Sequence, residues 1–329
     1  MSNLSDRGFV VDRAVFIPSI VFLLSTVSVV LLFPDASGAA FGALQAAIVE
    51  NASWFYGIVM AILLVASVVL AFSRVGTIRL GPDNSSPDYS LFSWLSMLFA
   101  AGVGIGLMFY GVAEPVVHYL RPPVGEGAAL GGENQAVNLT MLHWGFNAWS
   151  VYALMALVLA YFSFRRGLPL TLRSAFYPIL GDSIYGPWGA AIDVFAIVCT
   201  TFGISTSLGL GVEQLSTGLN YLFGVPESGG LKLAITVAIM AMAAVSVALG
   251  LDSGIKRLSE INSFLAIALL CFVLLAGPTA LVLGGTLENF GYYVANLITT
   301  STNLFTYEDT EWLGGWTIFY WGWWISWAP

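Results

Sequence analysis

The sequence predicts an all-α integral membrane protein. Hydrophobic residues make up 58% of the 329 residues and charged residues only 9%, whereas about 25% of the residues in an ordinary soluble domain are charged. The mean hydropathy is +0.84. Apolar runs of about 20 residues, the length at which a helix crosses a ~30 Å hydrocarbon core, recur along the whole chain. The composition therefore excludes a water-soluble protein and predicts a single transmembrane domain over residues 1–329.

Eight runs have the length and composition of a membrane span. They are Ala14–Phe33, Trp54–Phe72, Tyr89–Val117, Leu139–Phe164, Trp188–Gly211, Leu233–Leu249, Ser263–Leu283 and Leu313–Pro329. The first run is too long for a signal peptide and lacks a clean cleavage motif, so we expect a true span. The last supplies only about 25 Å of helix and has no polar flank, which predicts a truncated chain. Between the last two runs, Glu288–Trp312 mixes apolar and polar residues and is typical of a helix along the membrane interface.

The placement of charge predicts a cytoplasmic N-terminus. With the N-terminus inside, all but two of the eleven Lys and Arg residues fall on the inner side: Arg7, Arg13, Arg74, Arg79, Arg165, Arg166, Arg173, Lys256 and Arg257. The outer loops hold only Arg121 and Lys232, and nine of the nineteen acidic residues lie on the outer side. This asymmetry follows the positive-inside rule and predicts a multi-pass protein of the cell's inner (plasma) membrane.

The titratable residues of the spans give no sign of an enzyme. His118 and His143 lack the partner spacing of a metal site or a catalytic triad. Glu114, Asp193 and Glu213 are the acids nearest the hydrocarbon, and acids within a membrane are functional candidates by default. Each lies near a predicted span end, so we interpret it as an acid that reaches water at the headgroups. We therefore expect no catalytic residues.

Three glycines, Gly102, Gly104 and Gly106, occupy alternate positions in the third run. Without Cβ atoms, the backbone there can leave α-helical geometry or be approached closely. Non-helical carbonyls at membrane depth are tolerated where they face protein, a ligand or an ion. Gly102 and Gly106 also form a G-xxx-G pair, which is typical of close helix packing. The spacing alone favours neither interpretation.

Aromatic residues gather in two runs. Trp144, Trp149 and Tyr152 fall within about 140° of one helix face, and Trp149 lies about 15 Å or more from each end of its run. The last run repeats aromatics at i, i+4, i+7, i+8 and i+11, which makes one stripe about 100° wide: Trp316, Tyr320, Trp323, Trp324 and Trp327. Trp and Tyr are common at the two membrane–water interfaces, which explains some of these rings but not those that lie deep in the membrane. Deep ring faces suit a quaternary ammonium, because its charge cannot be stabilised by hydrogen bonds. Each cation–π contact would contribute about 0.5–2 kcal/mol.

The fifth run carries a cluster of hydroxyls, namely Thr200, Thr201, Ser205, Thr206 and Ser207. Hydroxyls at this density can coordinate Na⁺ or a carboxylate. Ser and Thr in membrane helices also bond the carbonyl four residues earlier or a neighbouring helix. Both interpretations remain open from the spacing.

Four stretches resemble the betaine/choline/carnitine transporter family. They are Gly102–Gly111 with Glu114 and Pro115, His143–Tyr152, Ser207–Gly211 and Phe319–Trp327, and the last is highly specific. The resemblance covers essentially the whole chain. It implies the five-helix inverted-repeat (LeuT-type) transporter fold, of which this chain would hold the first repeat and the start of the second.

The resemblance also implies the roles of particular residues. An aromatic box for the ammonium maps to Trp144, Trp149, Tyr152 and Trp324, beside the stretch that contains Gly102, Gly104 and Gly106. Trp323 and Trp327 would line the inner exit path. In sodium-coupled members, ion sites would use Ala100 and Val103 and a hydroxyl that matches Thr201, whereas Ile204 departs from that pattern. The coupling ion, Na⁺ or H⁺, is the only cofactor expected.

By this resemblance, the expected function is secondary active transport (symport) of a quaternary-ammonium osmolyte. Gly106 matches the pattern of betaine carriers, because choline carriers tend to place an acid there, so a zwitterion is favoured over choline. Glycine betaine is the expected substrate, with dimethylsulfoniopropionate, carnitine or choline as alternatives. The expected partners are this small zwitterionic or cationic solute and membrane lipid, with no nucleic acid; relatives often form homotrimers. A channel or a non-transporting membrane scaffold is the alternative, although no continuous polar stripe supports a channel.

Overall fold

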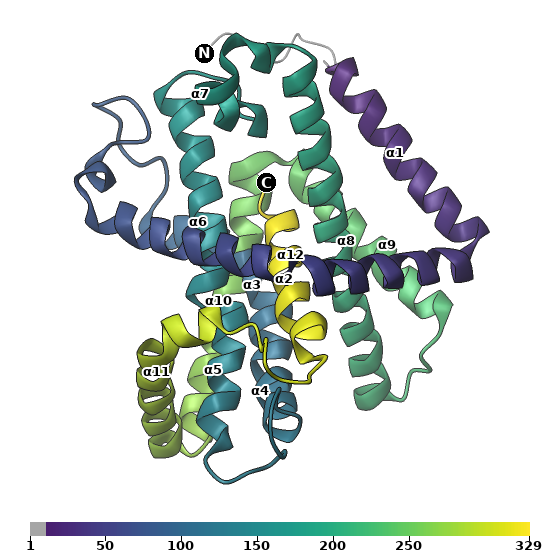
Figure 1. The fold of residues 1–329 in the computed structure, drawn as a ribbon, viewed down its shortest axis with the longest axis vertical. Coiled ribbons are helices and arrows are strands. Elements are labelled where there is room, and N and C mark those ends of the chain that lie inside the picture. The colour runs from purple at the N-terminus through teal and green to yellow at the C-terminus, as the bar shows by residue number, and fades with distance from the viewer. Residues whose placement is uncertain (1–10) are drawn as a thin grey trace. The chain divides into compact units, whose positions relative to one another are not determined.

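The computed structural model describes residues 11–329, and the regular elements within that range are helices (Figure 1). Arg7, one of the basic residues assigned to the inner side, lies outside the described residues. The chain divides into two compact units, each built from segments that are far apart in the sequence. The first unit comprises Met1–Asn84, Trp149–Ile204 and Gly314–Pro329, and the second comprises Ser85–Ala148 and Ser205–Leu313. Helices α6 (Phe146–Ala160) and α8 (Pro187–Phe223) contribute to both.

Within the described range, six helices are long and apolar enough to cross a membrane, or seven spans if a bent pair counts as one. The six are Arg13–Leu32, Pro34–Phe72, Gly132–Arg165, Pro187–Phe223, Gly229–Ala248 and Leu251–Ala276, and the bent pair is Leu91–Ala100 with Gly104–Leu120. By this criterion the described residues hold fewer candidate spans than the eight predicted. The final run forms only the five-residue π-helix η8 (Gly314–Ile318) and the nine-residue α12 (Phe319–Trp327), which are too short to qualify.

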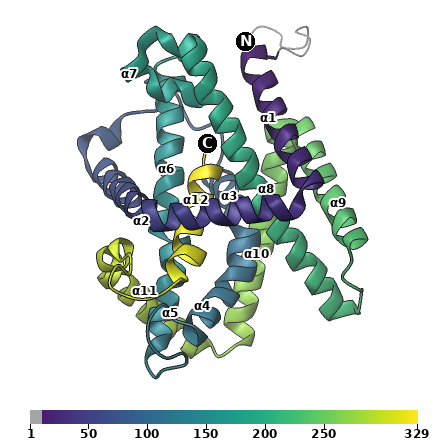
Figure 2. The ribbon, with the colours of Figure 1, turned by 45° about the vertical axis from the view of Figure 1, so that its right-hand side comes forward.

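In the first unit, α1 (Arg13–Leu32) and α2 (Pro34–Phe72) meet at a corner that is visible in Figure 1 and Figure 2. Pro34 causes the corner, because proline cannot continue a helix but fits well at the first position of the next. α2 is 39 residues long and begins well before the predicted span at Trp54. η8 and α12 pack against α2. The shorter elements of this unit are η2 (Arg74–Thr77), η4 (Tyr161–Arg165), η5 (Leu172–Phe176), α7 (Tyr177–Leu180) and η6 (Gly181–Tyr185).

The second unit packs its helices in pairs. α4 lies along α5, α5 also contacts α11, and α3 packs on α10 (Figure 1). The elements are α3 (Leu91–Gly102), η3 (Val103–Tyr110), α4 (Gly111–Leu120), α5 (Gly132–Trp144), α9 (Gly229–Ala248), η7 (Leu251–Ile255), α10 (Lys256–Ala276) and α11 (Thr279–Thr302). This packing brings α11 against α5, although the two helices are distant in the sequence.

Two predicted boundaries change in this unit. The span expected to reach Leu283 ends at Ala276, because Gly277 is extended and Pro278 lacks an N–H. α11 then begins at Thr279, nine residues before the expected interfacial helix, and ends at Thr302. α11 is not one of the six candidate spans, as expected for this segment.

The run predicted as one helix over Leu139–Phe164 is interrupted at Gly145. α5 ends at Trp144, Gly145 leaves helical geometry with φ −94° and ψ −141°, and α6 begins at Phe146. The Tyr293 hydroxyl accepts a hydrogen bond from the Phe146 amide at 2.8 Å, which satisfies an N–H that the helix start leaves unpaired. The single aromatic face that regular helical periodicity predicted across the run is therefore wrong, because the periodicity does not continue past Gly145.

Gly203 on α8 is expected to be necessary for the seating of α12. A Cβ at this position would lie 2.9 Å from Ser326 Oγ and 2.9 Å from the backbone nitrogen of Trp327. Replacement by alanine forces these atoms apart, and overpacking of this kind costs about 1–3 kcal/mol. We expect Gly203→Ala to lower the thermal unfolding temperature of the purified protein.

The matched control is Gly209→Ala on the same helix, where an added Cβ meets nothing within 4 Å. Alanine is favoured over glycine inside a helix by about 1 kcal/mol, so this variant should unfold at the parent temperature or above it. Equal unfolding temperatures for the two variants would contradict the assigned contact.

Candidate functional site

An aromatic cluster in the first unit brings together four rings from α6 and α12. Tyr152 lies at its centre, with ring-centroid distances of 5.9 Å to Trp149, 6.0 Å to Trp324 and 5.3 Å to Trp327. These separations are within the range at which aromatic pairs attract each other. The structure therefore places Trp149, Tyr152 and Trp324, three of the four rings expected for the box, in one cluster, and Trp327 joins them.

The predicted aromatic stripe of the last run is confirmed as a row of contacting rings. Trp323 and Trp324 stack at 4.7 Å, Tyr320 lies 5.8 Å from Trp324, and Trp316 stacks on Tyr320 at 6.2 Å. Tyr320, Trp323 and Trp324 are buried. The Trp323 indole N–H also donates to the Gly203 carbonyl at 3.1 Å, which ties this ring to α8.

Trp144, the remaining ring expected for the box, lies in the second unit at the end of α5. Its indole N–H donates to Oε2 of Glu114 at 2.7 Å, and its ring stacks on Tyr110 at 5.8 Å. The ring also covers Gly106, where an added Cβ would lie 2.5 Å from Trp144 Cζ3. Glycine is therefore required at position 106 if Trp144 is to keep this position.

The glycine stretch departs from α-helical geometry, as one of the two interpretations predicted. Val103–Tyr110 forms a π-helix, η3, and the helices Leu91–Ala100 and Gly104–Leu120 are bent by 65° relative to each other. Gly102 is the last residue of α3. A Cβ on Gly104 would meet nothing within 4 Å, so this glycine makes no close packing contact of the kind seen at Gly106.

The residues expected at ion sites make hydrogen bonds within the protein. The Thr201 hydroxyl donates to the Ile197 carbonyl, four residues earlier, at 2.7 Å. The Ala100 carbonyl accepts from Asn262 Nδ2 of α10 at 3.3 Å, and Val103 opens η3. Ala100 and Val103 belong to the second unit and Thr201 to the first.

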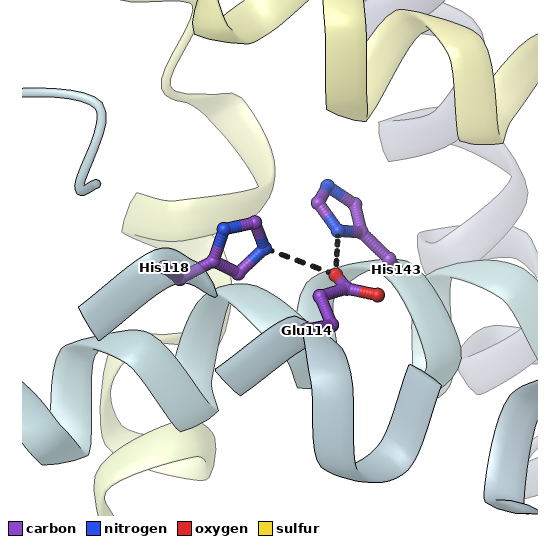
Figure 3. Close-up of side chains that lie close together, drawn as sticks. All are labelled: Glu114, His118 and His143. Carbon is purple, nitrogen blue, oxygen red and sulfur yellow. Dashed lines mark hydrogen bonds and ion pairs between the residues drawn. The ribbon is translucent and has the colours of Figure 1, made fainter. Parts of the chain in front are cut away.

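A buried cluster of Glu114, His118 and His143 occupies the region between α4 and α5. Oε1 of Glu114 accepts hydrogen bonds from His118 Nε2 at 3.1 Å and from His143 Nδ1 at 2.5 Å, and Figure 3 shows the carboxylate between the two imidazole rings. All three side chains are fully buried. Each can offer one ligand atom, and these atoms lie within 4.8 Å of one another. We refer to these three residues as the Glu114 cluster.

Two interpretations of the titratable residues are therefore wrong. Glu114 does not reach water at a helix end, and the two histidines do have a partner. One signal was present in the sequence, because Glu114 and His118 are four residues apart and so share a helix face. His143 belongs to a different helix, and nothing in the sequence spacing places it beside Glu114.

The other two acids differ from each other. Asp193 is buried, and it accepts hydrogen bonds from the backbone nitrogen of Arg173 at 2.9 Å and from its Nε at 2.5 Å, so headgroup water is not its partner. Burial alone would lower the pKa of Arg173, but the carboxylates of Asp193 and Asp12 outweigh burial and raise that pKa above its usual value. Glu213 is exposed and pairs with Lys232, as an acid at a helix end would.

Comparison with known proteins gives one consistent result. The betaine/carnitine/choline family transporter profile matches residues 14–329. A glycine betaine transporter of Acinetobacter baylyi is 47% identical over 328 residues, covering 100% of this chain and 50% of the relative. A high-affinity choline transport protein of Escherichia coli K12 is 42% identical over 97% of this chain and 47% of the relative. A glycine betaine/proline/choline transporter of Vibrio parahaemolyticus is 43% identical over 98% of this chain and 61% of the relative. The chain spans about half the length of these curated relatives.

The burial of Glu114 leads to a prediction about stability. Glu114→Ala removes an acceptor that three donors share, and breaking a buried charged pair costs about 3–5 kcal/mol. The control, Glu213→Ala, removes the same type of residue from an exposed pair, which contributes about 0–1 kcal/mol. We expect a large fall in thermal unfolding temperature for Glu114→Ala and little change for Glu213→Ala. Similar unfolding temperatures for the two variants would rule out the buried hydrogen-bond cluster.

Proposed function

Because this chain belongs to the betaine/carnitine/choline transporter family, we propose that it acts as a secondary active transporter for a quaternary-ammonium osmolyte, glycine betaine above all. Two of the relatives named above carry glycine betaine in their names, and two carry choline. The family consists of transporters, and the chain is not an enzyme. In this proposal it is a multi-pass protein of the plasma membrane with a cytoplasmic N-terminus, and it assembles as a homotrimer.

The observation that carries the proposal is the aromatic cluster around Tyr152. Three indoles lie within 5.3 to 6.0 Å of this phenol ring, measured between ring centroids. A quaternary ammonium has no N–H to donate, so ring faces can replace its lost hydration at about 0.5–2 kcal/mol per ring. All four side chains are uncharged, which suits a zwitterion of zero net charge better than a bare cation. The same rings would also accept the sulfonium group of dimethylsulfoniopropionate.

Gly106 supports a zwitterionic substrate by a separate argument. The Trp144 ring lies against this glycine and leaves no room for a Cβ. An acidic side chain at position 106, which could neutralise the charge of choline, would displace Trp144. In this proposal Gly102, Gly104 and Gly106 form the flexible backbone beside the substrate.

Transport against a gradient requires a coupling ion, and we propose Na⁺ or H⁺ for this role. Sodium ions would be held at two separate sites, the first using the carbonyls of Ala100 and Val103 and the second using the hydroxyl of Thr201. The Ala100 carbonyl and the Thr201 hydroxyl would then exchange their present hydrogen bonds, to Asn262 and Ile197, for an ion. Trp323 and Trp327 would line the inner exit path.

The proposed ring site is tested by Trp324→Leu in the natural gene product, reconstituted in liposomes. Loss of one ring should weaken the binding of radiolabelled glycine betaine by about 2- to 30-fold, which corresponds to ~0.5–2 kcal/mol, and should reduce uptake. Trp188→Leu is the control, because Trp188 is exposed at the start of α8 and makes no part of the cluster. Unchanged affinity in Trp324→Leu, with the protein correctly inserted, would remove the basis of the ring site.

The same preparation identifies the substrate and separates a carrier from the alternatives. Competition of dimethylsulfoniopropionate, carnitine and choline against glycine betaine should rank the zwitterions above choline. Uptake by a carrier saturates and depends on a Na⁺ or H⁺ gradient. Non-saturating flux would indicate a channel, and binding without uptake would indicate a scaffold.

A further inference from the structure

One face of α2 is turned towards the protein along much of the helix. Val49, Tyr56, Met60 and Ser67 lie within about 40° of one another around the helix axis. All four side chains are buried or half-buried, and Met60 has no exposed surface. Val65, on the opposite side of the helix, is 60% exposed. We refer to Val49, Tyr56, Met60 and Ser67 as the Val49 face.

The first part of the Val49 face packs on η8 and α12 (Figure 1). A Cβ added to Gly314, the first residue of η8, would lie 2.9 Å from Val49 Cγ1 and 3.0 Å from Cγ2. Carbon atoms pack at about 3.5–4.0 Å, so η8 can lie this close to α2 only because position 314 is glycine. Further along α2, the Tyr56 hydroxyl lies 4.0 Å from where a Cβ on Gly322 of α12 would be, an ordinary van der Waals distance.

The last residue of the Val49 face contacts α6, the other helix of the aromatic cluster. The Ser67 hydroxyl donates to the Ser150 carbonyl at 3.5 Å. Ser150 directly follows Trp149 and lies two residues before Tyr152. Between Val49 and Ser67, α2 is a continuous helix of about 27 Å with no internal proline. One rigid helix therefore contacts both helices that supply the rings.

A displacement of η8 would reach the rings of the cluster. Trp316 of η8 stacks on Tyr320 at 6.2 Å, and Tyr320 lies 5.8 Å from Trp324. η8 continues directly into α12 at Phe319, so no loop lies between them to absorb a shift. As a π-helix, η8 also determines which side of α12 faces Tyr152, because one additional residue in a helical turn rotates all that follows by about 100°.

On another side, α12 is held by α8. The Trp323 indole donates to the Gly203 carbonyl at 3.1 Å, and a Cβ on Gly203 would lie 2.9 Å from Ser326 Oγ. Together, η8 and α12 thus have two close backbone approaches, one to α2 at Gly314 and one to α8 at Gly203. Each approach requires a glycine, so neither helix can be moved towards or away from α12 without a change of contact.

We propose that the Val49 face positions the aromatic cluster, and that Val49 is a positioning residue for the quaternary-ammonium site. The four rings of the cluster come from α6 and α12, and α2 acts on them by holding η8 and α12 relative to α6. A cation is attracted to a ring only within about 6 Å of its centroid, so displacement of a ring weakens binding. The effect on binding rests on the function proposed above, but the control of ring positions does not.

The control of ring positions is tested without substrate, by fluorine nuclear magnetic resonance of the natural gene product labelled with 5-fluorotryptophan. The signals of Trp324 and Trp327 are assigned by their loss in Trp324→Phe and Trp327→Phe. Trp188, which is exposed at the start of α8, gives the reference signal. In Gly314→Ala the signals of Trp324 and Trp327 should shift and that of Trp188 should not. Unshifted Trp324 and Trp327 signals would overturn the proposal.

The matched control is Gly315→Ala, because a Cβ at this neighbouring position meets nothing within 4 Å. Its spectrum should be that of the parent protein. A second substitution, Val49→Ala, removes both Cγ atoms that the new methyl group of Gly314→Ala meets. The double variant should therefore return the shifted signals towards their parent positions, as expected for residues in contact. Shifts that persist in the double variant would show that Val49 is not the contact responsible.

The effect on binding is measured as the dissociation constant of glycine betaine for the folded, monodisperse fraction of each variant. We expect Gly314→Ala to raise this constant by about 2- to 30-fold, the range for loss of one ring contact, and the double variant to reverse most of the change. A purely structural role would lower the yield or the unfolding temperature and leave the constant of the folded fraction unchanged. That outcome would overturn the positioning role.

Val49→Ala alone serves if Gly314→Ala fails to fold. It leaves a space beside Gly314 into which η8 can move, so the dissociation constant should rise about twofold or more. Val65→Ala is the control, because it makes the same substitution on the exposed side of the same helix. Equal dissociation constants for these two variants would contradict the role of Val49.

The two proposals fail in distinguishable ways. If the parent protein bound no glycine betaine, the proposed substrate would be wrong, while the fluorine signals would still decide whether α2 positions the rings.

Discussion

The constraint on which this structure depends is that every backbone N–H and C=O in a membrane must find a partner within the protein. Continuous helices meet this requirement without help, which explains why the described residues form long helices. Each interruption needs a specific solution. At Gly145 the solution is the Tyr293 hydroxyl, which accepts the hydrogen bond of the Phe146 amide. In the glycine stretch, the chain widens into the π-helix η3, whose backbone hydrogen bonds still lie within the helix.

These interruptions position the side chains of the candidate site. The end of α5 at Gly145 leaves Trp144 as the last residue of a helix, where its indole reaches Glu114 on α4. The widening at η3 places Gly106 under the same ring. In the first unit, the short α12 presents its aromatic row to Tyr152 of α6. The irregular parts of the fold thus contain the residues of the candidate site, and the regular helices hold them in place.

The sequence predicted the helical class and most of the helices, because apolar length alone determines which segments can span a bilayer. It also predicted the contacts among Trp316, Tyr320, Trp323 and Trp324, since these residues are close along one helix. The break at Gly145 was missed because the residue that stabilises it, Tyr293, is distant in the sequence. The Glu114 cluster was missed for the same reason, since only tertiary packing brings His143 to Glu114. Contacts between residues on the same face of one helix can be predicted from the sequence. Contacts that form when distant helices pack together cannot.

The hydrogen bond between the Trp323 indole and the Gly203 carbonyl is a weak connection between α12 and α8. A single neutral hydrogen bond contributes about 0.5–1.5 kcal/mol to stability, which is only one to three times the thermal energy at room temperature. The position of the Trp323 ring is therefore set mainly by its burial and by its contacts with Phe319, Tyr320 and Trp324, and the hydrogen bond adds a smaller contribution.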